Sequence, residues 1–185
     1  MVHDLIMRRR SLRAIDPHRK VEKHRLLEML EAARWAPSCS NNQPWRFIIP
    51  EDDLVIEVKH CLTKGNAWAL NASHIIVVAS KPELDCQKKD RNYYTLGIGL
   101  AIENLLLQGT ALDLVVHPIA GFDESRLKEV LDLPEDFFIH VCIPIGYPGD
   151  IEDLDESSAK KELDERARKS LDEIVHWGKW SDKSN

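Results

Sequence analysis

The 185-residue chain lacks the short motifs that mark several large enzyme classes. It has no His-Glu-x-x-His pair, no Gly-x-Ser-x-Gly elbow, no P-loop and no Gly-x-Gly-x-x-Gly turn. Its eight histidines are not grouped at the spacing that metal ligands require. These absences argue against a metal centre, a serine nucleophile, a Walker-type nucleotide site and a Rossmann-type dinucleotide site.

Cysteine is also scarce. The chain has four, Cys39, Cys61, Cys86 and Cys142, which are far apart and form no Cys-x-x-Cys pair. We therefore expect neither a disulfide framework nor a zinc site, and a reducing cytoplasm is the simplest location. Cys39 lies in an unusual loop, but no base is near it in the sequence. We interpret it as a small filler rather than a nucleophile.

Long uncharged hydrophobic runs are absent. The longest apolar stretch, residues 96–116, carries Glu103, Asn104, Gln108 and Asp113, so it predicts a buried helix rather than a membrane span. The first residues, MVHDLIMRRRSLR, contain no apolar core, so we expect no secretory signal. With 43% hydrophobic residues, 30% charged residues and a net charge of −6, the chain predicts a soluble globular protein that does not bind nucleic acid through bulk charge.

Hydrophobic periodicity predicts an α+β fold with about four strands. The expected helices cover residues 3–10, 21–35, 51–62, 93–112, 123–133 and 158–177. The expected strands cover residues 45–50, 74–80, 115–122 and 138–148. Helix 93–112 is apolar nearly all round and should be central, and Asp123 is expected to cap helix 123–133. In helix 21–35, one apolar face is expected to contain Leu26, Leu27, Leu30 and Ala33.

The two ends of the chain differ in composition. Residues 151–185 have too few apolar positions to form a domain of their own. We therefore expect residues 1–150 to form the folded domain, and residues 151–185 to be an extension that packs on a partner subunit.

The segment RRRSLR, residues 8–13, places four arginines and a serine within an acidic protein. On a helix, Arg9 and Arg13 would be i, i+4 neighbours, and Arg10 and Arg13 would be i, i+3 neighbours. Like charges so placed repel one another unless an anion lies between them. Arginine forks and the Ser11 hydroxyl suit a phosphate. The alternative is a solvated basic face.

Three further segments could contact a ligand. The loop PSCSNNQP, residues 37–44, gathers short hydrogen-bonding side chains between two prolines, although such residues are also typical of an ordinary turn. In HPIAGFD, residues 117–123, Pro118 fixes the backbone and Gly121 permits close approach to a ligand, with a plain strand-to-helix loop as the alternative. Arg166 and Arg168 lie in the last expected helix, where a solvated face is the alternative.

Taken in this order, the segments resemble the nitroreductase family of FMN-dependent oxidoreductases. Residues 9–13 resemble the family's Arg-Arg-Ser-x-Arg, and residues 33–45 resemble its Ala-Arg-x-Ala-Pro-Ser-x-x-Asn-x-Gln-Pro-Trp. Residues 102–123 resemble its central helix with the Pro-Ile-x-Gly-Phe loop, and IPIGYP resembles the end of its last strand. The similarity runs over roughly residues 6–177.

The resemblance implies an α+β sandwich with a central, mostly antiparallel sheet of four to five strands flanked by helices. It also implies an intertwined homodimer with two FMN sites at the interface, each built from both chains. One chain would hold the phosphate and ribityl chain, and its partner would line the flavin with the loop at residue 37. The residues implied to bind the cofactor are Arg9, Arg10, Ser11, Arg13, Pro37, Ser38, Cys39, Asn41, Asn66, Pro118, Ile119, Ala120, Gly121, Arg166 and Arg168.

Two departures from the family pattern concern the substrate. Many relatives have an acidic residue where this chain has Ala120, and many have an aspartate where it has Thr95. The segment between residues 51 and 93 is short, which implies less cover over the flavin. The natural substrate is therefore not predicted.

The implied activity is hydride transfer from NADH or NADPH through flavin N5 to a small acceptor such as a nitroaromatic or a quinone, with ping-pong kinetics. No side chain is expected to act as a catalytic acid. One alternative keeps the fold but changes the chemistry, as in reductive dehalogenation or flavin fragmentation. Others are a flavin-storing or flavin-sensing module with little turnover, and an interaction protein whose residues 8–13 bind an anionic partner.

Overall fold

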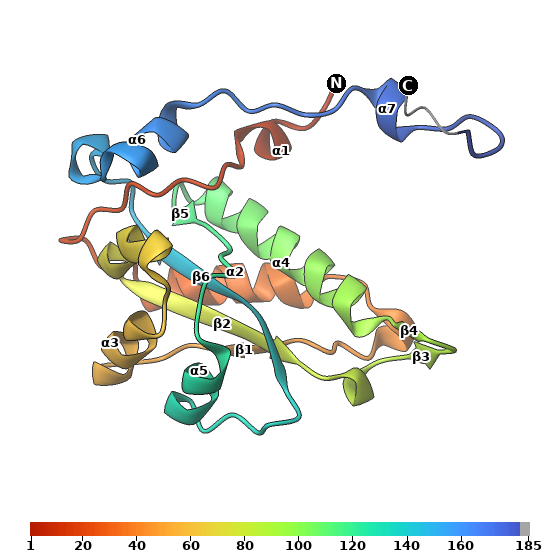
Figure 1. Ribbon diagram of the computed structural model, residues 1–185, viewed down its shortest axis with the longest axis horizontal. Helices are drawn as coiled ribbons and strands as arrows, with labels where there is room; N and C mark the ends of the chain where they lie inside the picture. Colours follow the sequence, from red (N-terminus) through yellow and green to blue (C-terminus); the bar gives the residue numbers. More distant parts are fainter. Residues whose placement is uncertain (182–185) are drawn as a thin grey trace.

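The computed structural model describes residues 1–181 and contains a four-stranded antiparallel sheet (Figure 1). The strand order is β1-β2-β6-β5, and two short strands, β3 and β4, form a separate hairpin. The bounds are β1 Arg46–Ile48, β2 His74–Ser80, β3 Gln87–Lys88, β4 Arg91–Asn92, β5 Val115–Val116 and β6 Phe138–Gly146. The α+β fold with an antiparallel sheet is confirmed.

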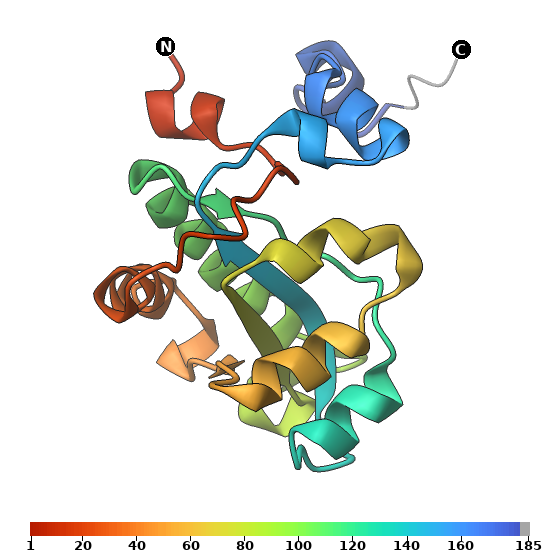
Figure 2. The same ribbon diagram turned by 90° about the vertical axis from the view of Figure 1, so that its left-hand side faces the viewer.

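Helices cover both faces of the sheet, which makes a three-layer sandwich (Figure 2). The helices α2 (Lys23–Arg34) and α4 (Tyr94–Ala111) pack against each other on one face. The opposite face carries α3 (Asp53–His60), the 3₁₀ helix η2 (Lys64–Asn71) and α5 (Glu124–Val130). The remaining elements are α1 Asp4–Arg8, η1 Cys39–Asn41, η3 Pro82–Leu84, η4 Ile151–Asp153, α6 Glu156–Leu163 and α7 Leu171–Ile174.

Strand β2 explains why the core has two parts. Its side chains alternate between the sheet faces, so Ile76 and Val78 pack with α2 and α4, while Ile75 and Val77 pack with α3 and α5. The predicted strand at residues 74–80, buried on both faces, is confirmed. His74 is satisfied as a structural histidine, because its Nε2 lies 2.9 Å from the carbonyl oxygen of Val21.

Helix α4 is buried on one side only in the single chain. Ile98, Ala101 and Leu105 belong to the core, but Leu96 is 59% exposed and Leu100 is 39% exposed. The apolar sequence of this helix therefore serves two surfaces, one against the sheet and one that faces outward. Helix α2 also differs from expectation, because the residues that its core side buries are Leu26, Met29 and Ala33, while Leu27 is 56% exposed.

The chain ends also differ from the predicted helices. The first helix ends at Arg8, so the arginines that follow it lie on extended chain and are not helical neighbours. The predicted helix at 158–177 is wrong, because α6 ends at Leu163 and α7 contains only four residues. The hairpin of β3 and β4 was not predicted. None of the helices within residues 1–181 combines the length and apolar content that a membrane crossing requires.

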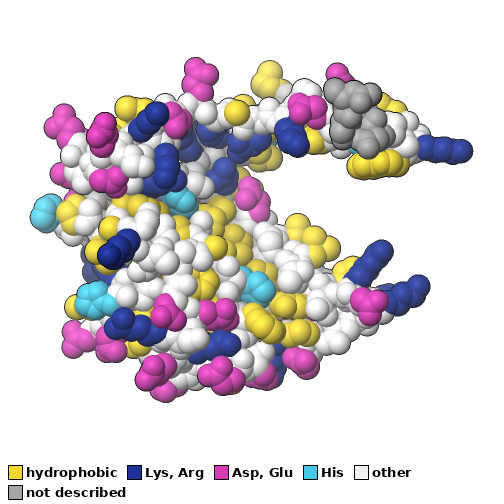
Figure 3. Space-filling view, in the orientation of Figure 1, with side chains coloured by type: hydrophobic (Ala, Val, Ile, Leu, Met, Phe, Trp, Pro, Cys, Tyr) yellow, Lys and Arg dark blue, Asp and Glu magenta, His cyan; other side chains and the backbone are white. Residues whose placement is uncertain are grey.

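Residues 164–181 form a C-terminal arm that contacts the N-terminal segment through Asp164 and Arg166 and otherwise stands apart from the body, with an open hollow between them (Figure 3). The arm exposes large apolar side chains, namely Leu171, Ile174, Trp177 and Trp180. Helix α6, in contrast, packs on its own chain and buries Ser158 and Glu162. The expected extension at residues 151–185 therefore begins with a docked helix, and its last four residues, 182–185, lie outside the described part of the chain.

The packing of α4 on the sheet depends on a missing side chain at Gly109. A Cβ added there would lie 2.8 Å and 2.9 Å from the two γ-carbons of Val116 on β5. We expect Gly109→Ala to lower the free energy of unfolding by about 1–3 kcal/mol in urea denaturation. Gly65→Ala is the control, since that Cβ meets nothing within 4 Å, and we expect a change within about 0.5 kcal/mol. Equal effects at both positions would contradict this close packing.

Candidate functional site

The two ends of the chain meet at the carboxylate of Glu162. Its Oε1 accepts hydrogen bonds from the backbone N–H groups of Arg13 at 2.9 Å and Ala14 at 3.0 Å, and its Oε2 also lies 2.9 Å from the Arg13 nitrogen. The Glu162 side chain is 4% exposed, so these bonds lie away from water. Helix α6 is therefore fastened to the segment that contains the clustered arginines.

Two of these arginines also bind the chain itself. Arg10 donates from Nη2 to the carbonyl oxygens of Glu162 at 2.6 Å and Asp164 at 2.5 Å. The Nη1 of Arg13 lies 3.9 Å from Oε2 of Glu162. The described contacts of Arg10 and Arg13 thus connect residues 9–14 to α6 and to the start of the arm.

Arg8 pairs with Asp113 at 2.5 Å, while Arg9 and two arginines of the C-terminal segment line a cavity of about 470 Å³. It is lined by Ile6, Met7, Arg9, Glu103, Arg166 and Arg168. Arg166 donates from Nη1 to the carbonyl oxygen of Arg9 at 2.8 Å and from Nη2 to that of Met7. The Nη1 of Arg9 lies 3.4 Å from the hydroxyl oxygen of Ser11. Four of the predicted residues, Arg9, Ser11, Arg166 and Arg168, are therefore brought together.

His117 holds the same segment from the side of the sheet. Its Nδ1 lies 3.0 Å from the carbonyl oxygen of Leu12, and its ring stacks on Trp68 with 4.8 Å between the ring centroids. The pKa of His117 is lowered to about 4, mainly by burial and in part by the charge of Arg13, while the hydrogen bond to Leu12 opposes this shift. At neutral pH the ring is uncharged and Nδ1 carries the proton that Leu12 accepts.

The loop after β5 is fixed by η2. The carbonyl oxygen of Gly121 accepts bonds from the Thr63 backbone N–H at 3.0 Å and from Nδ2 of Asn66 at 3.0 Å. A Cβ on Gly121 would lie 2.5 Å from that Asn66 nitrogen. The sequence predicted that Gly121 lets the backbone approach a ligand closely, and in the structure its close neighbour is the Asn66 side chain of η2. The side chain of Ile119 is buried, and its backbone pairs with Cys142, while Ala120 is exposed at the tip.

The loop at residues 37–44 uses its polar groups to hold its own shape. Ser38 accepts a hydrogen bond from the Gln43 N–H at 2.9 Å, and the positive φ angles of Ser40, Asn41 and Gln43 are 51°, 58° and 52°. Three left-handed non-glycine residues this close together are uncommon, and such conformations concentrate at functional sites. Pro37, Ser38 and Cys39 line a cavity of about 180 Å³ with Tyr93, Leu96, Gly97 and Leu100 at the start of α4. That cavity shares no residue with the arginine cavity.

Cys39 corrects the expectation of unpaired cysteines. Cys39 and Cys86 form a disulfide with their Cα atoms 5.9 Å apart, which ties the loop to the start of the β3–β4 hairpin. Cys39 is therefore neither a filler nor a free thiol. Asp85 lies beside the two sulfurs and accepts a bond from Asn42 at 3.1 Å. The spacing of 47 residues gave no indication of this pair, because connectivity cannot be read from spacing alone.

Several residues of this region were not predicted. Glu162, His117 and Trp68 organise the arginine segment, and Glu103 adds one acidic group to its cavity. Glu162 lies in a highly charged stretch of sequence, so nothing marked it as buried. His117 directly precedes the predicted Pro118 loop. It follows two apolar strand residues, and this position was the feature of the sequence that could have indicated its burial.

Hydrogen exchange at the two backbone amides that donate to Glu162 measures the role of this carboxylate. We expect Glu162→Ala to leave the N–H groups of Arg13 and Ala14 unpaired, at about 1–3 kcal/mol each, and to accelerate their hydrogen exchange. Glu165→Ala, at an exposed position three residues later, is the matched control. Unchanged exchange at both amides in Glu162→Ala would contradict the fastening of α6.

The disulfide predicts a thiol count. In protein purified without reductant and unfolded in guanidinium, a thiol reagent should detect two free thiols, Cys61 and Cys142, and all four after reduction. Unfolding is required because burial raises the pKa of both free thiols, that of Cys142 to about 12. The Cys86→Ser control should show three. Four thiols without reductant would show that the pair is not bonded.

Comparisons with known proteins agree with this architecture. The sequence model of the nitroreductase family matches residues 6–59 and 57–147. An Archaeoglobus fulgidus protein named "Putative NADH dehydrogenase/NAD(P)H nitroreductase" is 32% identical over 162 residues, which cover 83% of this chain and 88% of that protein. The Enterobacter cloacae oxygen-insensitive NAD(P)H nitroreductase is 24% identical, over 85% of this chain and 93% of its own.

A solved structure extends the likeness to the whole fold. A crystal structure described as an oxidoreductase containing FMN superposes with a TM-score of 0.87 and 30% identity, covering 99% of this chain and 94% of the other. The family match covers more than half of the chain. The same chain has the motifs at residues 9–13 and 33–45 and the antiparallel sandwich. The chain belongs to the nitroreductase family.

Proposed function

We propose that this chain is an FMN-dependent NAD(P)H oxidoreductase. Family membership supports this, as do relatives named as NAD(P)H nitroreductases and the FMN-containing oxidoreductase that shares 30% of its sequence. When bound, FMN would supply the redox chemistry by taking two electrons from NADH or NADPH and passing them to a small acceptor. The residues of this chain bind and orient the reactants.

The observation that carries the proposal is the convergence of Arg9, Arg166 and Arg168 on one cavity. These residues come from opposite ends of an acidic chain with a net charge of −6, so their meeting needs a local reason. Guanidinium forks bind phosphate oxygens in pairs, and three of them outweigh the single acid Glu103. The donor set therefore fits the phosphate of FMN, with the Ser11 hydroxyl as a further donor beside Arg9.

The loop Pro118–Gly121 would lie along the flavin ring. Asn66 and Thr63 hold its Gly121 carbonyl, and Ile119 is anchored in the sheet by Cys142, so the loop is preorganised. Among its residues, Ala120 is exposed and offers no acidic or basic group. No described side chain is assigned a proton-transfer role.

We also propose that the working form is a homodimer. The exposed Leu96 and Leu100 of α4 lie beside the loop at residues 37–39, around the same small cavity. A second copy would cover this apolar face. The loop of one chain would then reach the flavin held by the other chain and line it with Pro37, Ser38, Cys39 and Asn41. The C-terminal arm, with its exposed tryptophans, would lie on that copy.

The acceptor would be a small electrophile such as a nitroaromatic or a quinone. NAD(P)H and the acceptor would occupy the same place beside the ring in turn, which gives ping-pong kinetics. Parallel lines in double-reciprocal plots would agree with this order of binding, and intersecting lines would contradict it.

Removal of the converging charges tests the phosphate assignment. We expect Arg9→Ala and Arg168→Ala each to weaken FMN binding about tenfold or more, since a charge-assisted hydrogen bond contributes about 1.5–3 kcal/mol. Quenching of FMN fluorescence on titration measures the affinity. Arg126→Ala, at an exposed position on α5, is the control and should leave it unchanged. Equal affinity in all three variants would remove the assignment.

A further inference from the structure

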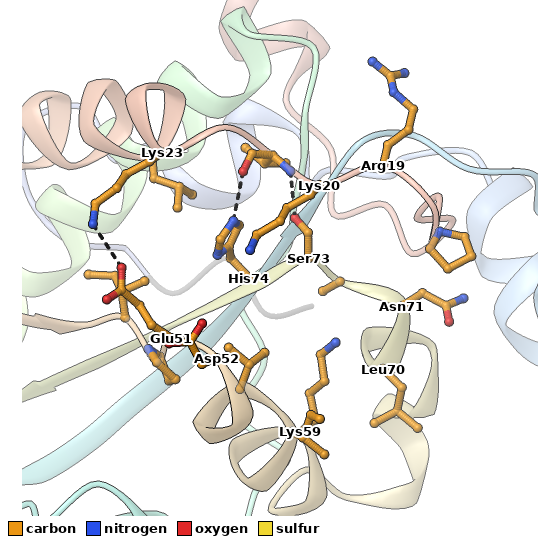
Figure 4. Close-up of a pocket in the computed structure, with 18 of the residues that line it drawn as sticks. Arg19, Lys20, Lys23, Glu51, Asp52, Lys59, Leu70, Asn71, Ser73 and His74 are labelled. Atoms are coloured by element: carbon orange, nitrogen blue, oxygen red, sulfur yellow. Dashed lines mark hydrogen bonds and ion pairs between the residues drawn. The ribbon is translucent and has the colours of Figure 1, made fainter.

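A third cavity, of about 840 Å³ and larger than the two described above, lies between α2, α3 and the end of η2 (Figure 4). The chain from Pro17 to Lys23 and the turn from Pro50 to Asp52 close its other sides. It shares no lining residue with the arginine cavity or with the cavity beside the loop at residue 37. The proposed FMN site does not use it.

The walls of this cavity combine apolar and polar groups in nearly equal measure, and the apolar part comes mainly from α2 and α3. Helix α2 presents Leu26, Leu27 and Leu30, and α3 presents Val55 and Ile56. Ile49, Leu70 and Ala72 complete the surface. Leu27, Ile56 and Leu70 are 56%, 53% and 47% exposed, so a ligand seated here would remove apolar area from water.

The charged groups around the cavity are mostly basic. Four cationic side chains line it, but only two acids, Glu51 and Asp52, do so. Lys23 is paired with Glu51 at 3.0 Å, and Arg19 lies over the Tyr147 ring at 3.7 Å from its centroid. Within residues 1–181, no ion pair or hydrogen bond of the Lys20 or Lys59 ammonium is found. These two cations are therefore left for an external partner.

Lys20 and Lys59 approach the cavity from different elements. Lys20 extends beside His74, and Lys59 rises from α3 (Figure 4). Burial lowers the pKa of Lys59, which reflects an ammonium partly withdrawn from water with no counterion. Burial is also the main cause that lowers the pKa of His74, and the charges of Lys20 and Lys59 both add to it. The charges of both ammonium groups therefore act on the His74 ring, and the charge of Glu51 acts on it in the opposite sense.

We propose that this cavity binds a small amphipathic carboxylate, with the anionic head between Lys20 and Lys59 and the apolar body against α2 and α3. Two lysines without counterions suit one compact anion, whereas the arginine forks of the other cavity suit a phosphate. The leucine, valine and isoleucine walls need an apolar body rather than a second charged group.

Calorimetric titration of the FMN-loaded protein with octanoate tests the proposal. We expect one octanoate per chain, with binding about tenfold weaker in Lys20→Met and in Lys59→Met, because methionine keeps the apolar stem and removes the charge. Lys160→Met, at an exposed position on α6, should bind octanoate as the unaltered protein does. Octanamide, which has the same chain without the charge, should bind at least tenfold more weakly than octanoate.

Methyl NMR spectra locate the ligand independently of any activity. Octanoate should shift the methyl signals of Val55 and Leu70 and leave those of Leu96 and Leu100 in place. The proposal would be overturned by no octanoate binding, by equal binding of octanamide, or by equal affinity in Lys59→Met and Lys160→Met. Heat and methyl shifts do not depend on flavin chemistry, so the titration can be repeated on protein without FMN. Octanoate binding in both forms would show that this site exists whether or not the proposed flavin site does.

Discussion

The buried carboxylate of Glu162 determines where both ends of the chain lie. Its two oxygens accept the backbone N–H groups of Arg13 and Ala14, at a side chain that is 4% exposed. A carboxylate that accepts several N–H bonds away from water is held strongly and in one orientation. Without this interaction, the bonds from Arg10 to the carbonyl oxygens of Glu162 and Asp164 would be the described polar ties left between α6 and the N-terminal segment, and Arg166 would be held less firmly beside Arg9.

The four arginines of the N-terminal segment have different partners, and Arg8 pairs with Asp113. Arg10 and Arg13 are occupied by the carbonyl and carboxylate oxygens of the C-terminal segment, so they stabilise the junction. Arg9 lines the cavity with Arg166 and Arg168, and Arg166 also donates to the carbonyl oxygens of Arg9 and Met7. Internal acidic partners, Asp113 for Arg8 and Glu162 for Arg13, neutralise part of this cluster, and the proposed FMN phosphate would neutralise more of it.

The sequence predicted most of the sheet and the central helix, because β2, β6 and α4 are long, largely apolar runs. It also predicted the Asp123 cap, which accepts the N–H of Arg126 at 3.1 Å. It did not predict the end of α1 at Arg8, the break after Leu163 or the Cys39–Cys86 pair. These features depend on contacts between residues far apart in the chain, such as Arg10 with Asp164, which local periodicity does not encode. The motifs indicated which residues to consider for the candidate site. The partners of its arginines could not be predicted from the sequence, because they come from distant parts of the chain.

The central claim is that the arginine cavity of one chain and the loop at residue 37 of another form one FMN site. Sedimentation velocity recorded at the visible absorption band of the flavin tests this most directly. We expect the flavin signal to sediment only with a species of two chains, at one FMN per chain, and dilution that separates the chains to release the flavin. Flavin that sediments with a single chain, or that does not sediment with the protein at all, would contradict the account.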